Sequence, residues 1–182
     1  MSADSDHPYS SNDGIYVLRT TQQNQVQLNL MADQKANIVI GVSLIFFTVA
    51  QRQLVNGLGE NELLILPLIM LATAMFGSFL LSVLVLAPKM RATRPCKPED
   101  LTNPLFFGSF RASNEDDYTD FLLKQVDGIE TSRRLLIRDI HQTGSVLHRK
   151  YRFLRLSYIC LTTGVIVSAL STIWILVDGS AV

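Results

Sequence analysis

The chain has 182 residues, of which 48% are hydrophobic and 18% are charged, with 16 basic and 16 acidic residues. Once its long apolar stretches are set aside, enough sequence remains for only one modest water-soluble region. These proportions exclude a large soluble enzyme core.

The first predicted element is a long helix that enters a membrane. Residues 1–13 are rich in serine and aspartate and poor in apolar side chains, so we expect a disordered leader there. From Ile15 onward no strong helix breaker occurs until Gly41, and residues 36–51 carry no charge. We therefore predict one helix over residues 14–52, with a polar first half and a membrane-spanning second half.

The second predicted span is the most apolar part of the chain. Residues 63–88 form an uncharged run of 26 residues, and about 20 helical residues are enough to cross a hydrocarbon core of about 30 Å. Gly57 and Gly59 predict a turn before it. We assign residues 53–61 to an external loop and residues 62–88 to the second span.

A linker and a second set of helices are predicted next. Prolines at 95, 98 and 104 favour extended or turning structure rather than helix over residues 89–112. Ser113, followed by acidic residues, is typical of a helix N-terminus, and Gly128 is expected to break or bend the helices of residues 113–155. An uncharged run then predicts a third span over residues 156–178, followed by a tail at residues 179–182.

Basic residues predict the orientation. Of the 16 Lys and Arg residues, 13 lie between Lys89 and Arg155, and basic loops stay in the cytoplasm. The sequence thus predicts an all-α membrane protein with three transmembrane helices, whose helical cytosolic extensions form a small bundle. The N-terminus is expected in the cytoplasm and the C-terminus outside it.

Small residues recur at every fourth position in two spans, at Ala74, Ser78 and Ser82 and at Gly164, Ser168 and Thr172. Such faces let helices approach closely in lipid, although chance is a comparable explanation in spans of this composition. Three spans are too few to enclose a pore, so we expect a homo-oligomer with these faces as subunit contacts.

Catalytic and metal sites find no support in the sequence. His141 and His148 share a helix face, but no carboxylate or cysteine stands at a matching spacing, and no phosphate-binding loop is present. Cys96 and Cys160 are expected to be free thiols. We expect no enzyme activity, no metal, no cofactor and no nucleic-acid partner.

Five charged residues are candidates for binding a ligand. Arg133, Arg134 and Arg138 lie within about two helical turns and could surround a phosphate, although Glu130 and Arg134 could equally form an ordinary surface pair. Asp33 and Lys35 precede the first span. Lys35 is explained as an interfacial anchor, whereas Asp33 requires a partner such as an arginine on the last helix. Positive-inside orientation and anionic lipid headgroups already explain four further basic residues, Arg149, Lys150, Arg152 and Arg155.

Three motifs in this order carry a resemblance to a known family. They are ADQKAN (residues 32–37), NPLFFGSF (residues 103–110) and KYRFL (residues 150–154). From Ile15 to Val177 the chain resembles the Pycsar effector domain family of bacterial anti-phage defence. The resemblance implies an inner-membrane protein with a periplasmic C-terminus. The resemblance also implies that cyclic UMP or cyclic CMP from a companion cyclase activates the protein. The activated protein would then impair the membrane and arrest or kill the cell.

Two other classes of function stay open at this point. One is a small membrane scaffold or partner subunit whose cytosolic bundle docks another protein and does not respond to nucleotide. The other is a membrane enzyme that acts on lipid, which would require a cluster of acids or histidines at the interface, and Asp33 alone does not supply one.

Overall fold

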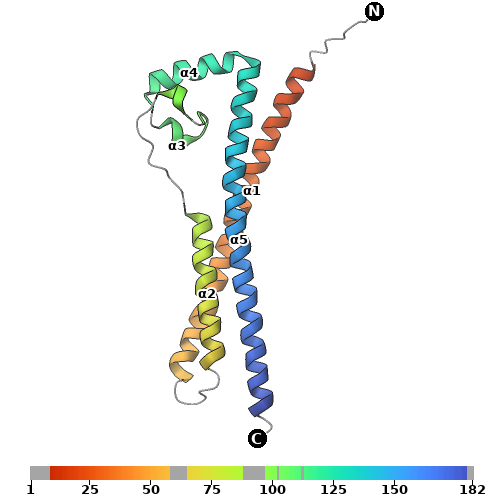
Figure 1. The fold of residues 1–182 in the computed structure, drawn as a ribbon, viewed down its shortest axis with the longest axis vertical. Helices are drawn as coiled ribbons and strands as arrows, with labels where there is room; N and C mark the ends of the chain where they lie inside the picture. The colour runs from red at the N-terminus through yellow and green to blue at the C-terminus, as the bar shows by residue number, and fades with distance from the viewer. Residues whose placement is uncertain (1–8, 58–64, 88–96, 102, 112, 180–182) are drawn as a thin grey trace, which may run out of the picture. The chain divides into compact units, whose positions relative to one another are not determined.

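All regular elements in the described part of the chain are helical. The computed structural model describes residues 9–57, 65–87, 97–101, 103–111 and 113–179 (Figure 1). In chain order the elements are α1 (Tyr9–Gly57), α2 (Ile65–Leu86), the 3-10 turn η2 (Pro98–Asp100), α3 (Phe107–Phe110), α4 (Glu115–Asp127) and α5 (Ile129–Gly179). Three of these described helices, α1, α2 and α5, are long and apolar enough to cross a membrane. The predicted all-α fold with three spanning helices is confirmed.

The chain divides into two compact units. The polar unit comprises Met1–Asn29 and Pro88–Leu147, and the spanning unit comprises Leu30–Ala87 and His148–Val182. The helices α1 and α5 each contribute residues to both units, whereas α2 belongs to the spanning unit and α4 to the polar unit.

Four buried serines join the three helices of the spanning unit. The Ser43 hydroxyl of α1 donates to Ser78 Oγ of α2 at 3.3 Å. Ser157 of α5 donates to the Ser78 carbonyl at 2.8 Å, and its Oγ lies 2.6 Å from Ser82 Oγ. Each hydroxyl therefore has a partner without exposing polar atoms to lipid, and hydrogen bonds of this kind stabilise helix contacts in membranes.

The small-residue faces of α2 and α5 pack against each other within one chain. Gly164 lies so close to α2 that a Cβ added there would overlap the Ala74 Cβ. Farther along, the Ser168 hydroxyl donates to the Pro67 carbonyl at 3.2 Å. The expectation that these faces form subunit contacts is wrong for this packing, because Gly164 and Ser168 are buried inside the chain's own helix bundle.

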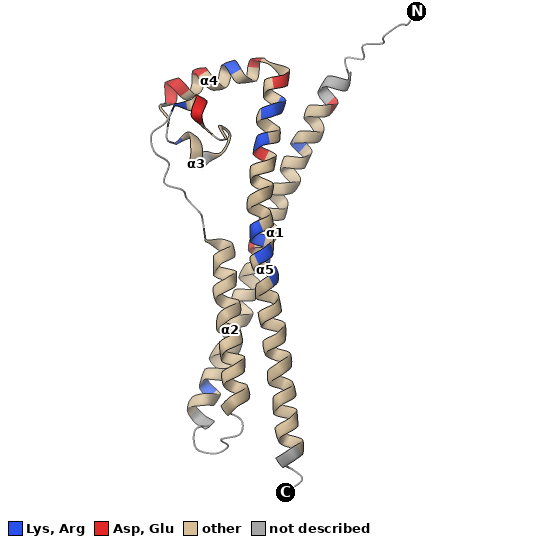
Figure 2. Cartoon of the chain, in the orientation of Figure 1, with Lys and Arg blue, Asp and Glu red and all other residues tan. Residues whose placement is uncertain are grey.

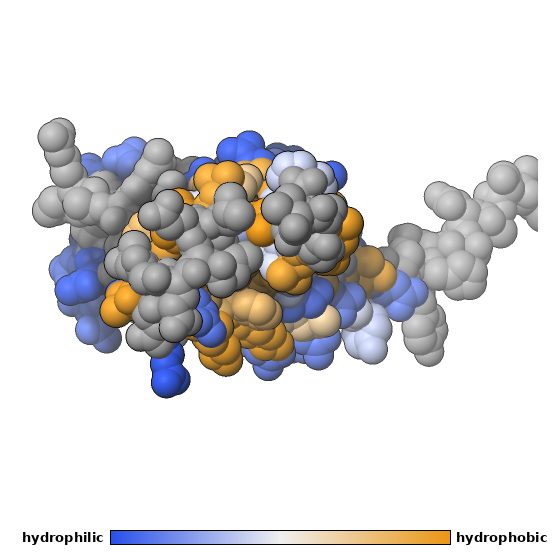
Figure 3. Space-filling model, turned by 90° about the horizontal axis from the view of Figure 1, so that it is seen from below, coloured by the Kyte–Doolittle hydropathy of each residue, from blue (hydrophilic) through white to orange (hydrophobic). Residues whose placement is uncertain are grey.

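Apolar side chains cover the outside of the spanning unit. Ile45, Leu66 and Leu170 are each more than 60% exposed, and Figure 3 shows hydrophobic surface around the helix ends nearest the viewer. A bundle in water would bury side chains of this kind, so the pattern is that of helices surrounded by lipid.

The ends of the helices differ from the sequence-based bounds. The helix α1 begins at Tyr9, within the predicted leader, and continues past Arg52 to Gly57. Apart from Gly14, no residue between Tyr9 and Ile15 disfavours a helix strongly, so the helix can extend into this segment. The helix α2 covers Ile65–Leu86, inside the predicted span 62–88. The predicted turn at Gly59 and the tail residues 180–182 lie outside the described residues.

The linker contains two short helical turns, η2 and α3, where the prolines predict none. Proline is tolerated at the start of a turn because its missing N–H would have no partner there. Asn114, not Ser113, is the N-cap of α4, and the Ser113 hydroxyl donates to the Phe110 carbonyl at 2.8 Å. The predicted break at Gly128 is confirmed, since α4 ends at Asp127 and α5 begins at Ile129.

Aromatic contacts hold α3 against α4 in the polar unit. The rings of Phe110 and Tyr118 lie 5.3 Å apart, and the Tyr118 hydroxyl donates to the Pro104 carbonyl at 2.9 Å. Burial raises the pKa of the Tyr118 phenol above its ordinary value of 10.0. The protonated phenol is the form that can donate this hydrogen bond.

Candidate functional site

Asp33 has a partner on the last helix, as its position demands. Lys150 Nζ of α5 lies 2.7 Å and 3.1 Å from the two carboxylate oxygens of Asp33 on α1, within the spanning unit. Both side chains are partly buried. The expected partner on the last helix is therefore present, and it is a lysine where an arginine was the suggested example. Lysine fits because its single ammonium group can reach both oxygens across a short gap between the two helices.

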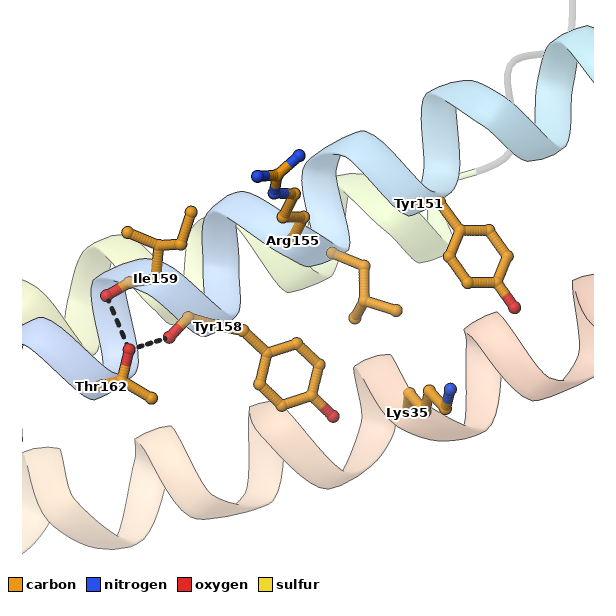
Figure 4. A pocket seen from close by; sticks show the side chains of 7 residues that line it. Lys35, Tyr151, Arg155, Tyr158, Ile159 and Thr162 are labelled. Carbon is orange, nitrogen blue, oxygen red and sulfur yellow. Dashed lines mark hydrogen bonds between the residues drawn. The ribbon is translucent and has the colours of Figure 1, made fainter.

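Lys35 lines a groove between α1 and α5 of the spanning unit. The groove has a volume of about 350 Å³, and seven residues line it: Lys35, Tyr151, Leu154, Arg155, Tyr158, Ile159 and Thr162. Figure 4 shows the rings of Tyr151 and Tyr158 extending from α5 toward α1 on either side of Lys35. A cation between two aromatic walls can attract an anion that also carries an apolar part.

The three candidate arginines lie on α5 in the polar unit but in different surroundings. Arg134 Nε is 3.2 Å from Glu130 Oε1, and both side chains are at least 70% exposed. An exposed pair of this kind contributes little to stability. Arg138 is also exposed, whereas the half-buried Arg133 lies against α1, with its guanidinium 3.5 Å from a Cβ added at Gly14. Figure 2 shows the basic residues of α5 as two separate groups, and in the sequence these three arginines are separated from the basic residues at 149–155.

Asp139 is the buried acid that the sequence analysis missed. It is 8% exposed, and its two oxygens accept hydrogen bonds from Gln22 Nε2 of α1 at 2.6 Å and from Asn103 Nδ2 at 2.9 Å. Asn103, 1% exposed, in turn accepts a hydrogen bond from the Leu105 N–H at 3.0 Å. Asp139 therefore joins α1, α5 and the segment before α3 in the polar unit.

A signal for Asp139 exists in the sequence. It lies four residues after Leu135, and both side chains are buried on α5, as positions four apart on a helix share a face. An acid on the buried face of a helix requires hydrogen-bond donors nearby. The asparagine of the NPLFFGSF motif is one of them, although nothing in the sequence pairs the two positions.

Three further side-chain oxygens on α1 and α5 of the polar unit are buried. Gln25 Oε1 and Asn29 Oδ1 of α1 and Gln142 Oε1 of α5 accept no hydrogen bond from any residue that the structure describes. Buried amide oxygens without donors are unfavourable by about 1–3 kcal/mol each. A bound water or ligand with N–H or O–H groups would satisfy them.

Metal-binding groups are missing from the described ranges. No three His, Cys, Asp or Glu side chains gather there in a way that could hold a metal ion, and His141 and His148 are exposed. Cys160 is a free thiol, and Cys96 lies outside the described residues. In the part of the chain that the structure describes, neither the groove nor the Asp139 contact includes a metal-binding cluster.

Comparison with known families decides the assignment. The model of the Pycsar effector protein domain matches residues 16–177, which include most of both units and every candidate residue above. The chain belongs to this family. No curated protein and no solved structure matches it. The Pycsar effector family functions in anti-phage cyclic pyrimidine signalling and is not a known enzyme family. Together with the three spanning helices, membership identifies this Pycsar effector as a membrane protein.

Proposed function

We propose that this Pycsar effector is switched on by cyclic UMP or cyclic CMP, made by a companion cyclase during phage infection, and then impairs the inner membrane. Growth arrest or cell death follows. The family match over residues 16–177 carries the proposal, because it includes the spans together with the polar unit. A polar module joined directly to membrane spans suits a protein that converts a soluble signal into a membrane event.

The helices α1 and α5 supply the physical route for the signal. They are 49 and 51 residues long, and each runs without a break through residues of both units. A ligand that binds one arrangement of the polar unit better than another shifts the population toward that arrangement. Unbroken helices then carry a rotation or shift into the spans.

Arg133, Arg134 and Arg138 are the proposed contacts of the cyclic phosphate. Guanidinium groups form paired hydrogen bonds with phosphate oxygens, and all three residues lie on one stretch of α5 in the polar unit. The Glu130 partner of Arg134 is exposed, so its exchange for a phosphate requires little rearrangement. Asp33 and Lys35 lie in the spanning unit. In this proposal they act on the response of the spans instead of contacting the nucleotide.

The proposed topology places the polar unit in the cytoplasm, where the nucleotide is made. The 13 basic residues between Lys89 and Arg155 favour that side, which leaves the C-terminus in the periplasm. Three spans packed on one another leave no pore in one protomer, so impairment of the membrane requires several copies. Exposed apolar side chains of the polar unit, including Leu123, Val126 and Ile129, offer contact surface for such an assembly.

The same exposed side chains favour one alternative, a membrane scaffold whose polar unit docks another protein. The test is calorimetry with cyclic UMP and cyclic CMP on the purified protein, combined with dye retention in liposomes. We expect one nucleotide to bind and to release dye. The double variant Arg133→Ala/Arg134→Ala should lose both effects, and Lys124→Ala, which removes an exposed cation from α4, should keep them.

Toxicity separates the two functions in cells. Co-expression with a pyrimidine cyclase should arrest growth only when the effector has its arginines intact. If neither nucleotide binds, and if co-expression leaves growth unchanged, the effector function is refuted and the scaffold is favoured.

A further inference from the structure

The groove on the spanning unit combines cations at one end with apolar side chains at the other. Leu154, 3% exposed, forms part of its lining. Lys35 lines it from α1 and Arg155 from α5, and in Figure 4 the Arg155 guanidinium points away from α1. Ile159 and Thr162 lie farther along α5 in the same groove. The groove is therefore amphipathic along its length.

No acid among the described residues neutralises the two cations of the groove. Neither Lys35 nor Arg155 forms an ion pair or hydrogen bond with any residue in the described ranges. The neighbouring acid, Asp33, is held by Lys150 at 2.7 Å and 3.1 Å. With the nearby carboxylate already paired, the groove keeps a positive potential that favours an anion.

The groove also lies at the level where the membrane begins. Lys35 is the last charged residue before the uncharged run 36–51, and Arg155 is the last before the uncharged run 156–177. Thr162 is seven residues beyond Arg155, about 10 Å along a helix. Its hydroxyl is bonded to the Tyr158 and Ile159 carbonyls at 2.8 Å and 3.2 Å. The far end of the groove thus offers a methyl group and not a free hydroxyl.

We propose that this groove binds the phosphodiester of an anionic phospholipid. The phosphate lies at Lys35, and the exposed Arg155 side chain turns toward it. The start of one acyl chain lies over Leu154, Ile159 and Thr162. Tyrosines such as Tyr151 and Tyr158 are typical of the headgroup level. A volume of about 350 Å³ accommodates a phosphoglycerol group with the first part of a chain.

A cyclic nucleotide carries the same phosphodiester monoanion, but this groove would place its polar base toward the hydrocarbon. The lipid is therefore the better chemical match. Lipid binding requires no nucleotide, so the inference is independent of the proposed signalling function and can fail or succeed without it.

Native mass spectrometry of the detergent-solubilised full chain tests the inference. Dioleoylphosphatidylglycerol and dioleoylphosphatidylcholine are titrated in parallel. We expect one phosphatidylglycerol to bind in preference to phosphatidylcholine, and Lys35→Gln/Arg155→Gln to weaken that affinity about thirtyfold, because two charge-assisted contacts are lost. The matched control Arg149→Gln/Arg152→Gln removes two exposed cations of α5 that lie outside the groove. It should change the affinity for phosphatidylglycerol no more than about threefold. Lys35→Arg should retain binding.

Three results would overturn the proposal. Equal weakening by the two double variants would mean general attraction to basic residues. Equal affinity for both lipids in the wild type would mean that no phosphodiester anion is selected. Displacement of the lipid by cyclic UMP or cyclic CMP, with nucleotide affinity lost in Lys35→Gln/Arg155→Gln, would assign the groove to the nucleotide. Unchanged circular dichroism of each variant ensures that binding and not folding is compared.

Discussion

Replacing Asp139 by alanine should release the segment that precedes α3. In the polar unit, Asn103 Nδ2 donates to Asp139 Oδ1 at 2.9 Å, and the Asn103 side chain is 1% exposed. Alanine removes the acceptor and leaves a buried amide donor without a partner. The Asn103 side chain is then no longer held in position, and the hydrogen bond that its Oδ1 accepts from the Leu105 N–H at 3.0 Å is weakened as well.

The magnitude follows from the burial of the contact. A hydrogen bond to a charged group contributes about 1.5–3 kcal/mol, and the low exposure of both side chains argues against a large discount for solvent. Taking about 2 kcal/mol, local opening of residues 103–106 should become roughly 30-fold more frequent, since 1.36 kcal/mol corresponds to a factor of ten. The contact with Gln22 should add less, because that side chain is only partly buried.

Hydrogen exchange read by mass spectrometry measures this opening on peptides covering residues 103–111. Amide exchange there should accelerate about 30-fold in Asp139→Ala, given that exchange reports the local opening equilibrium. Asp139→Asn keeps one acceptor oxygen, so its effect should be intermediate. Asp120→Ala, which removes an exposed acid from α4, serves as control. If Asp139→Ala and Asp120→Ala exchange within about threefold of each other, the contact does not hold the segment.

Two further predictions concern packing and pH. Gly164→Leu should force α2 and α5 apart, lower stability by about 1–3 kcal/mol and reduce the melting temperature in detergent. The control Gly77→Leu should not lower stability in this way, because there is open space beside Gly77. Equal losses of stability in the two variants would contradict the close packing at Gly164. Because burial raises the pKa of Tyr118 above 10.0, the folded state keeps a proton that the unfolded chain loses, so stability should decline as pH rises above 10.0 through the folded-state pKa. Tyr118→Phe should be about 1 kcal/mol less stable at neutral pH and should show a shallower alkaline decline in denaturant titrations; an unchanged slope would refute this assignment.

The membrane spans and the main helix break could be predicted from the sequence. Hydrophobicity over about 20 residues and the exclusion of charge are local properties, so the uncharged runs 63–88 and 156–177 are visible without any contact. The break at Gly128 is equally local, because glycine is a poor helix former. The requirement that Asp33 have a cationic partner also followed from its position beside a span.

What the sequence by itself determined was therefore the class of element and the groups that need partners. Only the tertiary structure decided which partners they have. In the polar unit Gln22 bonds Asp139, and in the spanning unit Asp33 bonds Lys150, each pair separated by 117 positions. Such pairings depend on the rotation and relative height of α1 and α5, which are fixed by side-chain packing over many turns and leave no mark at any single residue.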